Sequence, residues 1–374
     1  MSLSVKNLNG DTSFLITFSP PSAPDHCRER FPGAFTILLD PWLVGHSSVW
    51  NTAFQISHHT STPVVSSLKD LKPDLILISQ AKPDHCHRQT LCTLSPNSKI
   101  KILAVPEAAK LIKSWKHFLN PNISVLNPYS AKDNTSVYCI KLDAYTANTA
   151  AGQMTISYIP EKRDMTGLHN AMGITYRPPG TSFTNHAGMR IDLPLSPPLT
   201  PSRLHTAARP RSADSESSFE RAMHALSGVD SPMEGQLALT TTPPHLPGER
   251  TISVLYTPHG MSYPTLTSYI DTHLVPLGAL PLTALFHSMN VERNPWILGG
   301  LVARGFPGGL ELAQRIGAKY WISAHDEVKD NKGWATVWIK SRPYSLEEAQ
   351  RALNQELGTK TKLVVLDSGQ DFKT

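Results

Sequence analysis

The sequence predicts an α/β protein with a layered architecture, and three observations lead to this prediction. Strand-like and helix-like segments alternate through residues 1–120. Three β-type segments follow in residues 136–178, and strand–helix alternation resumes at residue 251. A chain of 374 residues with 40% hydrophobic side chains can also bury a sizeable core, which excludes disorder throughout.

The first half contains short apolar segments separated by polar loops. Within residues 74–79 the four central residues, 75–78, are all apolar, as is typical of a strand that is covered on both faces. An earlier strand must end at Asp40, because Pro41 restricts the residue before it. In chain order, the expected strands are residues 13–18, 35–39, 74–79 and 101–105. One expected helix starts at Arg88, and another covers residues 107–118.

The second half is richer in β-type patterns. A helix is expected after residue 260 and another at about residues 308–316, whereas residues 294–309 hold too many Gly and Pro residues for regular structure. The expected strands are residues 136–142, 154–160, 171–178, 251–257, 282–288 and 318–325.

Residues 192–250 have a different composition from the rest of the chain. They are rich in Pro, Ser, Thr and Arg, and such a segment cannot bury enough apolar surface to offset its conformational entropy. We expect a mostly disordered insertion, with one short helix near residues 218–226, inside a single domain that spans residues 1–374.

The overall charge gives no reason to expect a nucleic-acid or membrane partner, and a small-molecule substrate stays possible. Lys and Arg exceed Asp and Glu by 35 to 30, a net of +5, which gives no reason to expect nucleic-acid binding unless the charges cluster. There is no signal-peptide pattern and no run of about 18 apolar residues, so no membrane partner is expected. The four Cys residues form no CxxC pair, which favours a reducing, cytoplasmic location.

Four apolar strands end in loops that carry His or Asp. The loop residues are Asp40, then Asp84, His85 and His87, then His259, and finally His325. Ligands of open α/β sheets gather at the carboxyl ends of strands, so these loops can meet at one site. Imidazole and carboxylate groups together are typical ligands of zinc and non-haem iron.

These segments resemble the motifs of the metallo-β-lactamase fold superfamily, especially its lactonase-like branch and related fungal proteins. The resemblance covers nearly all of the chain outside the insertion. It rests on Leu38-Leu39-Asp40-Pro41, on Ser79 to His85, on His169 before Gly173-Ile174-Thr175-Tyr176, on the strand that leads to His259, and on Ile316-Gly317-Ala318-Lys319 before His325. It implies an αββα sandwich of four layers, in which the motif segments from both halves of the chain meet at one edge.

The chain departs from the H-x-H-x-D-H motif of that family at two ligand positions. Gln80 and Lys82 replace the first two His residues, and together with His169 they would face one metal position. A protonated Lys repels a cation and Gln is a poor ligand for transition metals, so this position is expected to be empty. The resemblance assigns a second metal position to Asp84, His85 and His325, and adds His259, which replaces a bridging Asp.

Further roles follow from the resemblance and from residue chemistry. Asp40 is expected to order the motif loop behind the ligands, while Gln80 and His169 lie behind the ligands or contact substrate. Lys82 is a candidate for stabilising an oxyanion, Asp84 for a catalytic role, and His287 for contact with substrate. The alternative for each is structural: Lys82 can pair with Asp84 in place of a metal, and the His residues can serve in turns or hydrogen bonds.

The resemblance implies a hydrolase that uses a single zinc or iron ion to activate water on an ester, lactone or thioester of a small metabolite. Two alternatives stay open. One is a metal-free family member that binds a ligand and catalyses nothing, and the other is a lyase-type or isomerase-type step. The substrate and the oligomeric state do not follow from the sequence.

Overall fold

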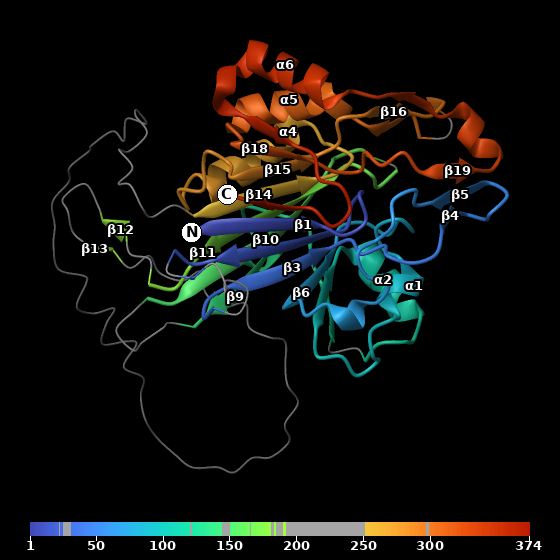
Figure 1. The fold of residues 1–374 in the computed structure, drawn as a ribbon. Coiled ribbons are helices and arrows are strands. Elements are labelled where there is room, and N and C mark those ends of the chain that lie inside the picture. The colour runs from blue at the N-terminus through green and yellow to red at the C-terminus, as the bar shows by residue number, and fades with distance from the viewer. Residues whose placement is uncertain are drawn as a thin grey trace. The chain divides into compact units, whose positions relative to one another are not determined.

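Two seven-stranded sheets pack face to face, and the computed structural model thereby confirms the αββα sandwich (Figure 1). The first sheet has the order β22-β1-β2-β3-β6-β7-β8 and the second β21-β18-β15-β14-β11-β10-β9. The described residues are 1–21, 23–24, 31–119, 122–143, 150–164, 166–180, 183–184, 190–191, 251–296 and 299–374. The expected insertion at residues 192–250 lies outside them, so its disorder stays a prediction.

Each sheet combines an antiparallel half with a parallel half. In the first sheet, β22 to β3 pair antiparallel and β3 to β8 pair parallel. Its strands are β1 (Ser2–Asn7), β2 (Phe14–Ser19), β3 (Phe35–Leu39), β6 (Leu75–Ile78), β7 (Lys101–Ala104), β8 (Ile123–Val125) and β22 (Asp371–Lys373).

The second sheet repeats this arrangement. Strands β9 to β14 pair antiparallel, and β14 to β21 pair parallel. Its strands are β9 (Val137–Leu142), β10 (Gly152–Pro160), β11 (Asn170–Arg177), β14 (Ile252–Thr257), β15 (Ala284–His287), β18 (Tyr320–Ser323) and β21 (Lys362–Val364).

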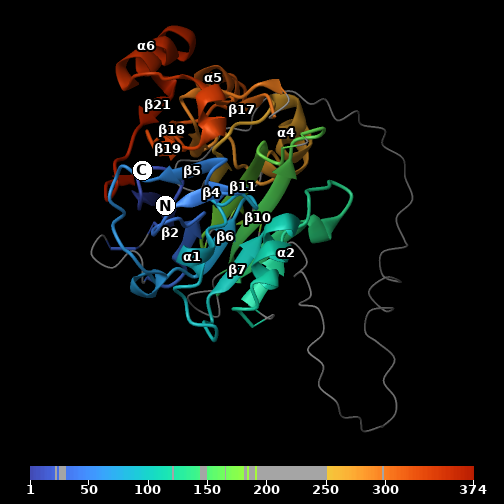
Figure 2. The same ribbon diagram turned by 90° about the vertical axis from the view of Figure 1, so that its right-hand side faces the viewer.

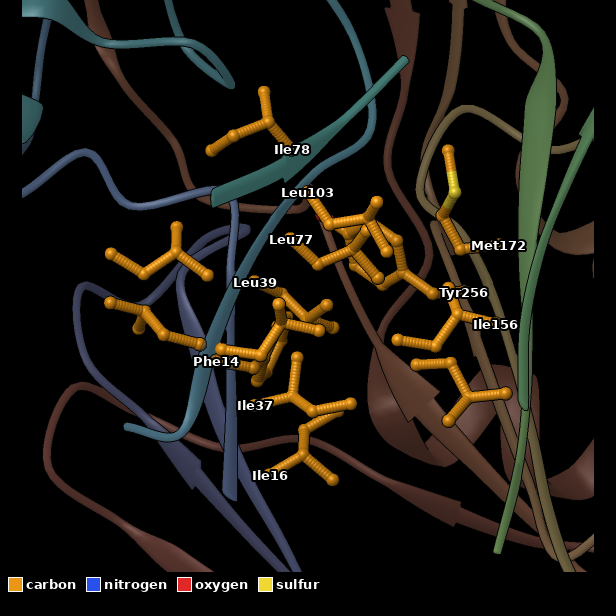
Figure 3. Close-up of a cluster of buried hydrophobic side chains, with 14 of the residues drawn as sticks. Phe14, Ile16, Ile37, Leu39, Leu77, Ile78, Leu103, Ile156, Met172 and Tyr256 are labelled. Carbon is orange, nitrogen blue, oxygen red and sulfur yellow. The ribbon is translucent and has the colours of Figure 1, made fainter. Parts of the chain in front are cut away.

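The main core lies between the sheets (Figure 3). Phe14 and Leu77 from the first sheet face Ile156, Met172 and Tyr256 from the second, and all five side chains are almost completely buried. Side chains alternate along a strand, so one strand can serve two cores. Burial at about 25 cal/mol per Å² of apolar surface makes this layer the main source of stability.

Helices cover the outer faces of the sheets (Figures 1 and 2). Leu255 of β14 and Leu285 of β15 belong to a second core, which they form with α4 and α5 on the outer face of the second sheet. On the first sheet, α2 packs beside β7 and β8. The helices are α1 (Arg88–Leu91), α2 (Pro106–Ser114), α4 (Tyr263–Tyr269) with a π-helical continuation (Ile270–Leu274), α5 (Gly305–Ile316) and α6 (Leu346–Leu357), with 3-10 turns at Leu68–Asp70, Asn134–Ser136, Trp334–Trp338 and Gly358–Lys360. Among the described residues, no helix has both the length and the apolar character that crossing a membrane requires.

Small sheets lie beside the sandwich. One joins β4, β5 and β19, another joins β16, β17 and β20, and β12 pairs with β13. Their bounds are β4 (Ser47–Val49), β5 (Gln55–His58), β12 (Phe183–Thr184), β13 (Arg190–Ile191), β16 (Val291–Arg293), β17 (Leu301–Ala303), β19 (Asp330–Lys332) and β20 (Lys340–Arg342).

The prediction of irregular structure at residues 294–309 is wrong for the second part of this segment. Strand β17 lies within it, and α5 begins at Gly305 rather than near residue 308. Pro307 is tolerated because it lies in the first helical turn, where its missing N–H has no intrahelical partner in any case. At Gly309 a Cβ would lie 2.2 Å from the Trp321 ring, so this glycine allows α5 to approach β18 closely.

Candidate metal centre

The carboxyl ends of parallel strands position the candidate site. Asp40 follows β3, the segment from Ser79 to His85 follows β6, His259 lies two residues beyond β14, and His325 lies two residues beyond β18. These strands belong to both sheets, so the site lies at one edge of the sandwich, as expected for ligands of parallel strands. Asp40 and His325 adopt positive φ values of 37° and 67°, a strained conformation that is typical of functional sites.

Asp40 orders His85 from behind. Its carboxylate is completely buried, and Oδ2 accepts hydrogen bonds from His85 Nδ1 at 2.8 Å, from the Tyr256 hydroxyl at 2.8 Å and from the Ser79 hydroxyl at 2.5 Å. The Ser79 backbone N–H donates to Oδ1 at 2.7 Å. A carboxylate that accepts from Nδ1 holds the proton on that atom, so the lone pair of His85 lies on Nε2. These contacts are the ones that the predicted role of Asp40 requires, and the role itself stays a prediction.

His259 presents the same ring atom to the site. Its Nδ1 donates to the Val302 carbonyl oxygen at 3.1 Å, and its Nε2 lies 3.1 Å from Nε2 of His85. Burial and the neighbouring imidazoles of His325 and His85 hold the pKa of His259 well below its usual value, so the ring is neutral. Two lone pairs at this separation repel each other unless a proton or a metal ion lies between them.

Gly260 makes the turn that presents His259. It has a φ of 77°, and a Cβ at this position would lie 2.5 Å from Nε2 of His287. Its backbone N–H donates to the Thr257 carbonyl at 2.9 Å, which closes the turn after β14. Only glycine combines this backbone conformation with the close approach to His287.

His325 and Asp84 complete the cluster. Nε2 of His325 lies 3.3 Å from Oδ2 of Asp84, and the same oxygen lies 3.8 Å from Nε2 of His85. Burial acts to raise the pKa of Asp84, but the imidazoles of His85 and His325 outweigh it and hold this pKa well below its usual value. Asp84 is therefore a carboxylate, and its side chain is 24% exposed.

The donor set fits a metal ion. His85, His259 and His325 each offer a ligand atom within 4.8 Å of the others, and all three residues are buried. Two nitrogens on a tetrahedral zinc ion are about 3.3 Å apart, close to the 3.1 Å between His85 and His259. Among the described residues, Nδ1 of His325 is buried without a hydrogen-bond partner, whereas Nε2 of the same ring faces Asp84.

The two halves of the chain therefore meet as the family resemblance implies. Each sheet combines antiparallel and parallel strands, and the buried His group lies where the parallel strands of both sheets end. The chain has the metallo-β-lactamase fold. No family model and no curated protein matches the sequence.

Solved structures with this overall arrangement are similar to the chain at low identity. Igni18, a metallo hydrolase from Ignicoccus hospitalis, has a TM-score of 0.45 and 12% identity, with 100% of this chain and 99% of that chain covered. A possible metal-dependent hydrolase from Veillonella parvula has a TM-score of 0.48 and 10% identity, with 100% and 99% covered. The metallo-β-lactamase fold protein YhfI from Bacillus subtilis has a TM-score of 0.42 and 10% identity, also with 100% and 99% covered. Because these values are so low, the fold assignment depends on the topology and loop positions of this chain itself.

A buried ion pair next to the candidate site was not predicted. Lys329 Nζ lies 2.8 Å from Oδ2 of Asp11, and the two side chains are 9% and 0% exposed. Burial acts to lower the pKa of Lys329, but the carboxylates of Asp11 and Asp84 outweigh it and raise this pKa above its usual value. No strand-end pattern marks either residue, and the sequence indicates only a turn at Gly10-Asp11.

Tyr256 was also missed as a site residue. It lies within the apolar run of β14, so its pattern indicates only a buried strand. Its hydroxyl donates to Asp40 across the inter-sheet core. A Tyr that is completely buried in a core usually has a hydrogen-bond partner, which is the signal that could have directed attention to it.

Gln80 and His169 lie near the site but face other groups. Nε2 of Gln80 donates to the Leu168 carbonyl at 3.2 Å. The ring nitrogens of His169 lie 2.8 Å from the Gly260 carbonyl oxygen and 3.0 Å from that of Leu301. Neither side chain joins the His85–His259–His325 group in the described part of the chain. The roles expected for them, behind the ligands or in contact with substrate, stay predictions.

Lys82 and His287 lie away from the ligand atoms. Lys82 is half-buried and lines a neighbouring hollow, and no ion pair joins it to Asp84 among the described residues. His287 has no exposed surface, and its Nδ1 donates to the Ser288 carbonyl at 2.7 Å. Their catalytic roles stay predictions. His87 accepts a hydrogen bond from the Thr90 backbone N–H and so caps α1.

Proposed function

We propose that this protein is a hydrolase that uses one metal ion, held by His85, His259 and His325, to act on an ester, lactone or thioester of a small metabolite. The observation that carries the proposal is the 3.1 Å separation of the Nε2 atoms of His85 and His259, in two rings whose Nδ1 atoms each face an oxygen acceptor. The family resemblance read from the motifs supplies the reaction class.

Zinc or iron fits the donor set, since three imidazoles and one carboxylate are typical ligands of these metals. When bound, such an ion would supply Lewis acidity toward a carbonyl oxygen and would lower the pKa of water to about 7. Asp84 is the candidate fourth ligand, because Oδ2 lies within 4 Å of both His85 and His325.

The chain's own residues prepare the ligands. Asp40 keeps the proton of His85 on Nδ1, and the Val302 carbonyl does the same for His259. Both Nε2 atoms therefore present lone pairs without any rearrangement. If Oδ2 of the partly exposed Asp84 carboxylate binds the ion, Oδ1 is the atom left to orient a water molecule or to accept a proton.

A metal-free ligand-binding protein is the competing function, and one observation favours it. His325 already contacts Asp84. The carboxylates of Asp11 and Asp84 raise the pKa of Lys329, so this side chain keeps its positive charge beside them. These contacts partly neutralise the carboxylate without a metal ion. A non-hydrolytic reaction at the same metal would leave the ligand set unchanged.

The proposal also includes a cytoplasmic location and a small-molecule substrate. Cys86, Cys92 and Cys139 are free thiols, which suits a reducing compartment. Burial raises the pKa of the Cys86 thiol, so this thiol is inert rather than a nucleophile.

Hydrolysis assays test the proposed function. Full-length protein loaded with zinc or iron(II) is given a panel of aryl esters, lactones and acyl thioesters, and we expect turnover of at least one class that a chelator abolishes. His85→Ala should remove the activity, whereas the matched control His58→Ala, which changes a partly exposed His on β5, should retain it. No metal-dependent turnover of any class would contradict the hydrolase proposal.

A further inference from the structure

A hollow lies beside the candidate metal centre, and none of the three His residues of that centre lines it. It has a volume of about 900 Å³ and lies between residues 46–50, the segment 81–92 and the end of α2. The described residues that line it include three cationic side chains, those of Lys82, Arg88 and Lys116, and no carboxylate. A concave surface lined by charge of one sign concentrates ligands of the opposite sign.

The sequence segment that forms much of this wall carries an excess of positive charge. Residues 82–116 contain seven Lys or Arg and two Asp or Glu, a net of +5, which equals the net charge of the complete chain. One of the two acids, Asp84, contacts His325 and does not line the hollow. In the part of the chain that the structure describes, no ion pair joins Lys82, Arg88 or Lys116 to a carboxylate.

Apolar and aromatic groups form the rest of the wall. Trp50 is 82% exposed, has a φ of 59° and contacts Phe54 at a ring-centroid distance of 4.5 Å. Trp115 and Leu111 line the opposite side, at the end of α2. A bulky residue in the left-handed region is strained, and such strain is typical of ligand-binding positions.

Hydrogen bonds of the imidazoles in the wall hold its segments together. His46 is exposed, and the carbonyl of this residue accepts a hydrogen bond from buried His87 at 3.1 Å. His117 donates to the Leu94 carbonyl at 2.9 Å. These contacts tie residue 46 and the end of α2 to the segment around α1, so the hollow has a defined wall.

We propose that this hollow binds a small organic anion, in which a carboxylate, sulfonate or phosphate group is attached to an aromatic or aliphatic body. Arg88, Lys116 and Lys82 bind the anionic group, and Trp50 and Trp115 contact the apolar body. The site does not depend on the proposed hydrolase activity. The two sites share only the segment from Gln80 to His87, which carries Lys82 toward the hollow and His85 toward the metal centre.

Calorimetric titration with 2-naphthoate tests the site in the full-length protein. We expect saturable binding of one equivalent, and no binding of the uncharged analogue 2-naphthylmethanol. The double variant R88A/K116A should weaken binding at least tenfold, and Trp50→Ala should weaken it as well. Lys113→Ala is the matched control, because this exposed lysine lies on α2 but does not line the hollow.

The outcomes separate a built site from general attraction. Equal weakening by Lys113→Ala and by R88A/K116A would reduce the effect to long-range charge and overturn the proposal. Binding of 2-naphthylmethanol as tight as that of 2-naphthoate would overturn it too, since the cations would then have no role. Inorganic phosphate, titrated as a competitor, separates the sources of the anion: displacement near the affinity of 2-naphthoate would overturn the requirement for an apolar body. Unchanged thermal unfolding midpoints show that each variant is folded.

Discussion

Single hydrogen bonds decide which atoms the candidate site can offer. Three groups share one oxygen of Asp40, and only one of them, His85, is directed toward the site. The second ligand is fixed in the same way by the Val302 carbonyl. Mutating a hydrogen-bond partner of a metal ligand commonly changes metal affinity by about 10- to 100-fold. The Asp40 network is therefore expected to affect metal binding as well as the ligands do.

His287 gives a prediction about pH at this scale. Burial lowers the pKa of this completely buried His from 6.5 to about 4. Between pH 6.5 and pH 4 the imidazole binds a proton in the unfolded chain but not in the folded protein. The folded state is therefore fully stable above pH 6.5 and loses stability as the pH falls toward 4. The expected loss between pH 7.5 and pH 5 is about 2 kcal/mol.

Chemical denaturation at the two pH values checks this prediction. In His287→Asn, whose side-chain amide can still donate to the Ser288 carbonyl, the free energy of unfolding should fall by about 2 kcal/mol less over this range than in the unchanged protein. Parallel pH dependences in the two proteins would show that His287 is not the titrating group.

At the scale of elements, a buried ion pair fastens the loop after β18 to the turn between β1 and β2. Asp11→Asn leaves Lys329 charged and buried without its partner, which should lower the free energy of unfolding by about 3–5 kcal/mol. The exposed pair Lys6–Asp371, with side chains 35% and 51% exposed, is the control, and Asp371→Asn should cost less than about 1 kcal/mol.

A second variant separates charge from packing at this position. Asp11→Asn combined with Lys329→Met removes both charges and should recover much of the lost stability. If the double variant is as unstable as Asp11→Asn alone, packing of the Asp11 turn rather than the unpaired lysine causes the loss.

Elements with a strong local pattern could be predicted, and those that depend on distant partners could not. The continuous apolar runs of β6 and β14 identified these strands to within one or two residues. By contrast, β1 pairs with β22 across the whole chain, through Ser4 and Lys373, and neither strand was predicted. The helix α6 was also missed, although Ser345 before two glutamates is an N-cap signal that could have identified it.

The site shows the same division. His85, His259 and His325 were predicted because each follows a recognisable strand. Lys329 and Tyr256 were not, because their importance comes from contacts with residues far away in the sequence. Long-range electrostatic partners leave no local pattern, so only the folded arrangement reveals them.

For the whole molecule, the expected insertion falls in the connection between two neighbouring strands of the second sheet. Strands β11 and β14 pair antiparallel, with Tyr176 opposite Ile252. The chain therefore leaves and re-enters the second sheet at adjacent positions, so the span between them needs no particular length.

Deletion tests this view of the insertion. Replacing residues 192–250 by a short Gly/Ser linker should leave the free energy of unfolding within about 1 kcal/mol of that of the full chain. Limited proteolysis of the full chain should cleave within this segment first. A deletion variant that fails to fold would show that the segment packs on the sandwich.

Metal content tests the central claim most directly. Full-length protein purified without chelator and analysed by elemental mass spectrometry should contain about one equivalent of zinc or iron. His85→Ala and His325→Ala should each reduce this to background, while the control His58→Ala retains the metal. An unchanged protein that contains no metal and takes none up on titration, or a His325→Ala variant with unchanged metal content, would contradict the claim that these imidazoles form a metal centre.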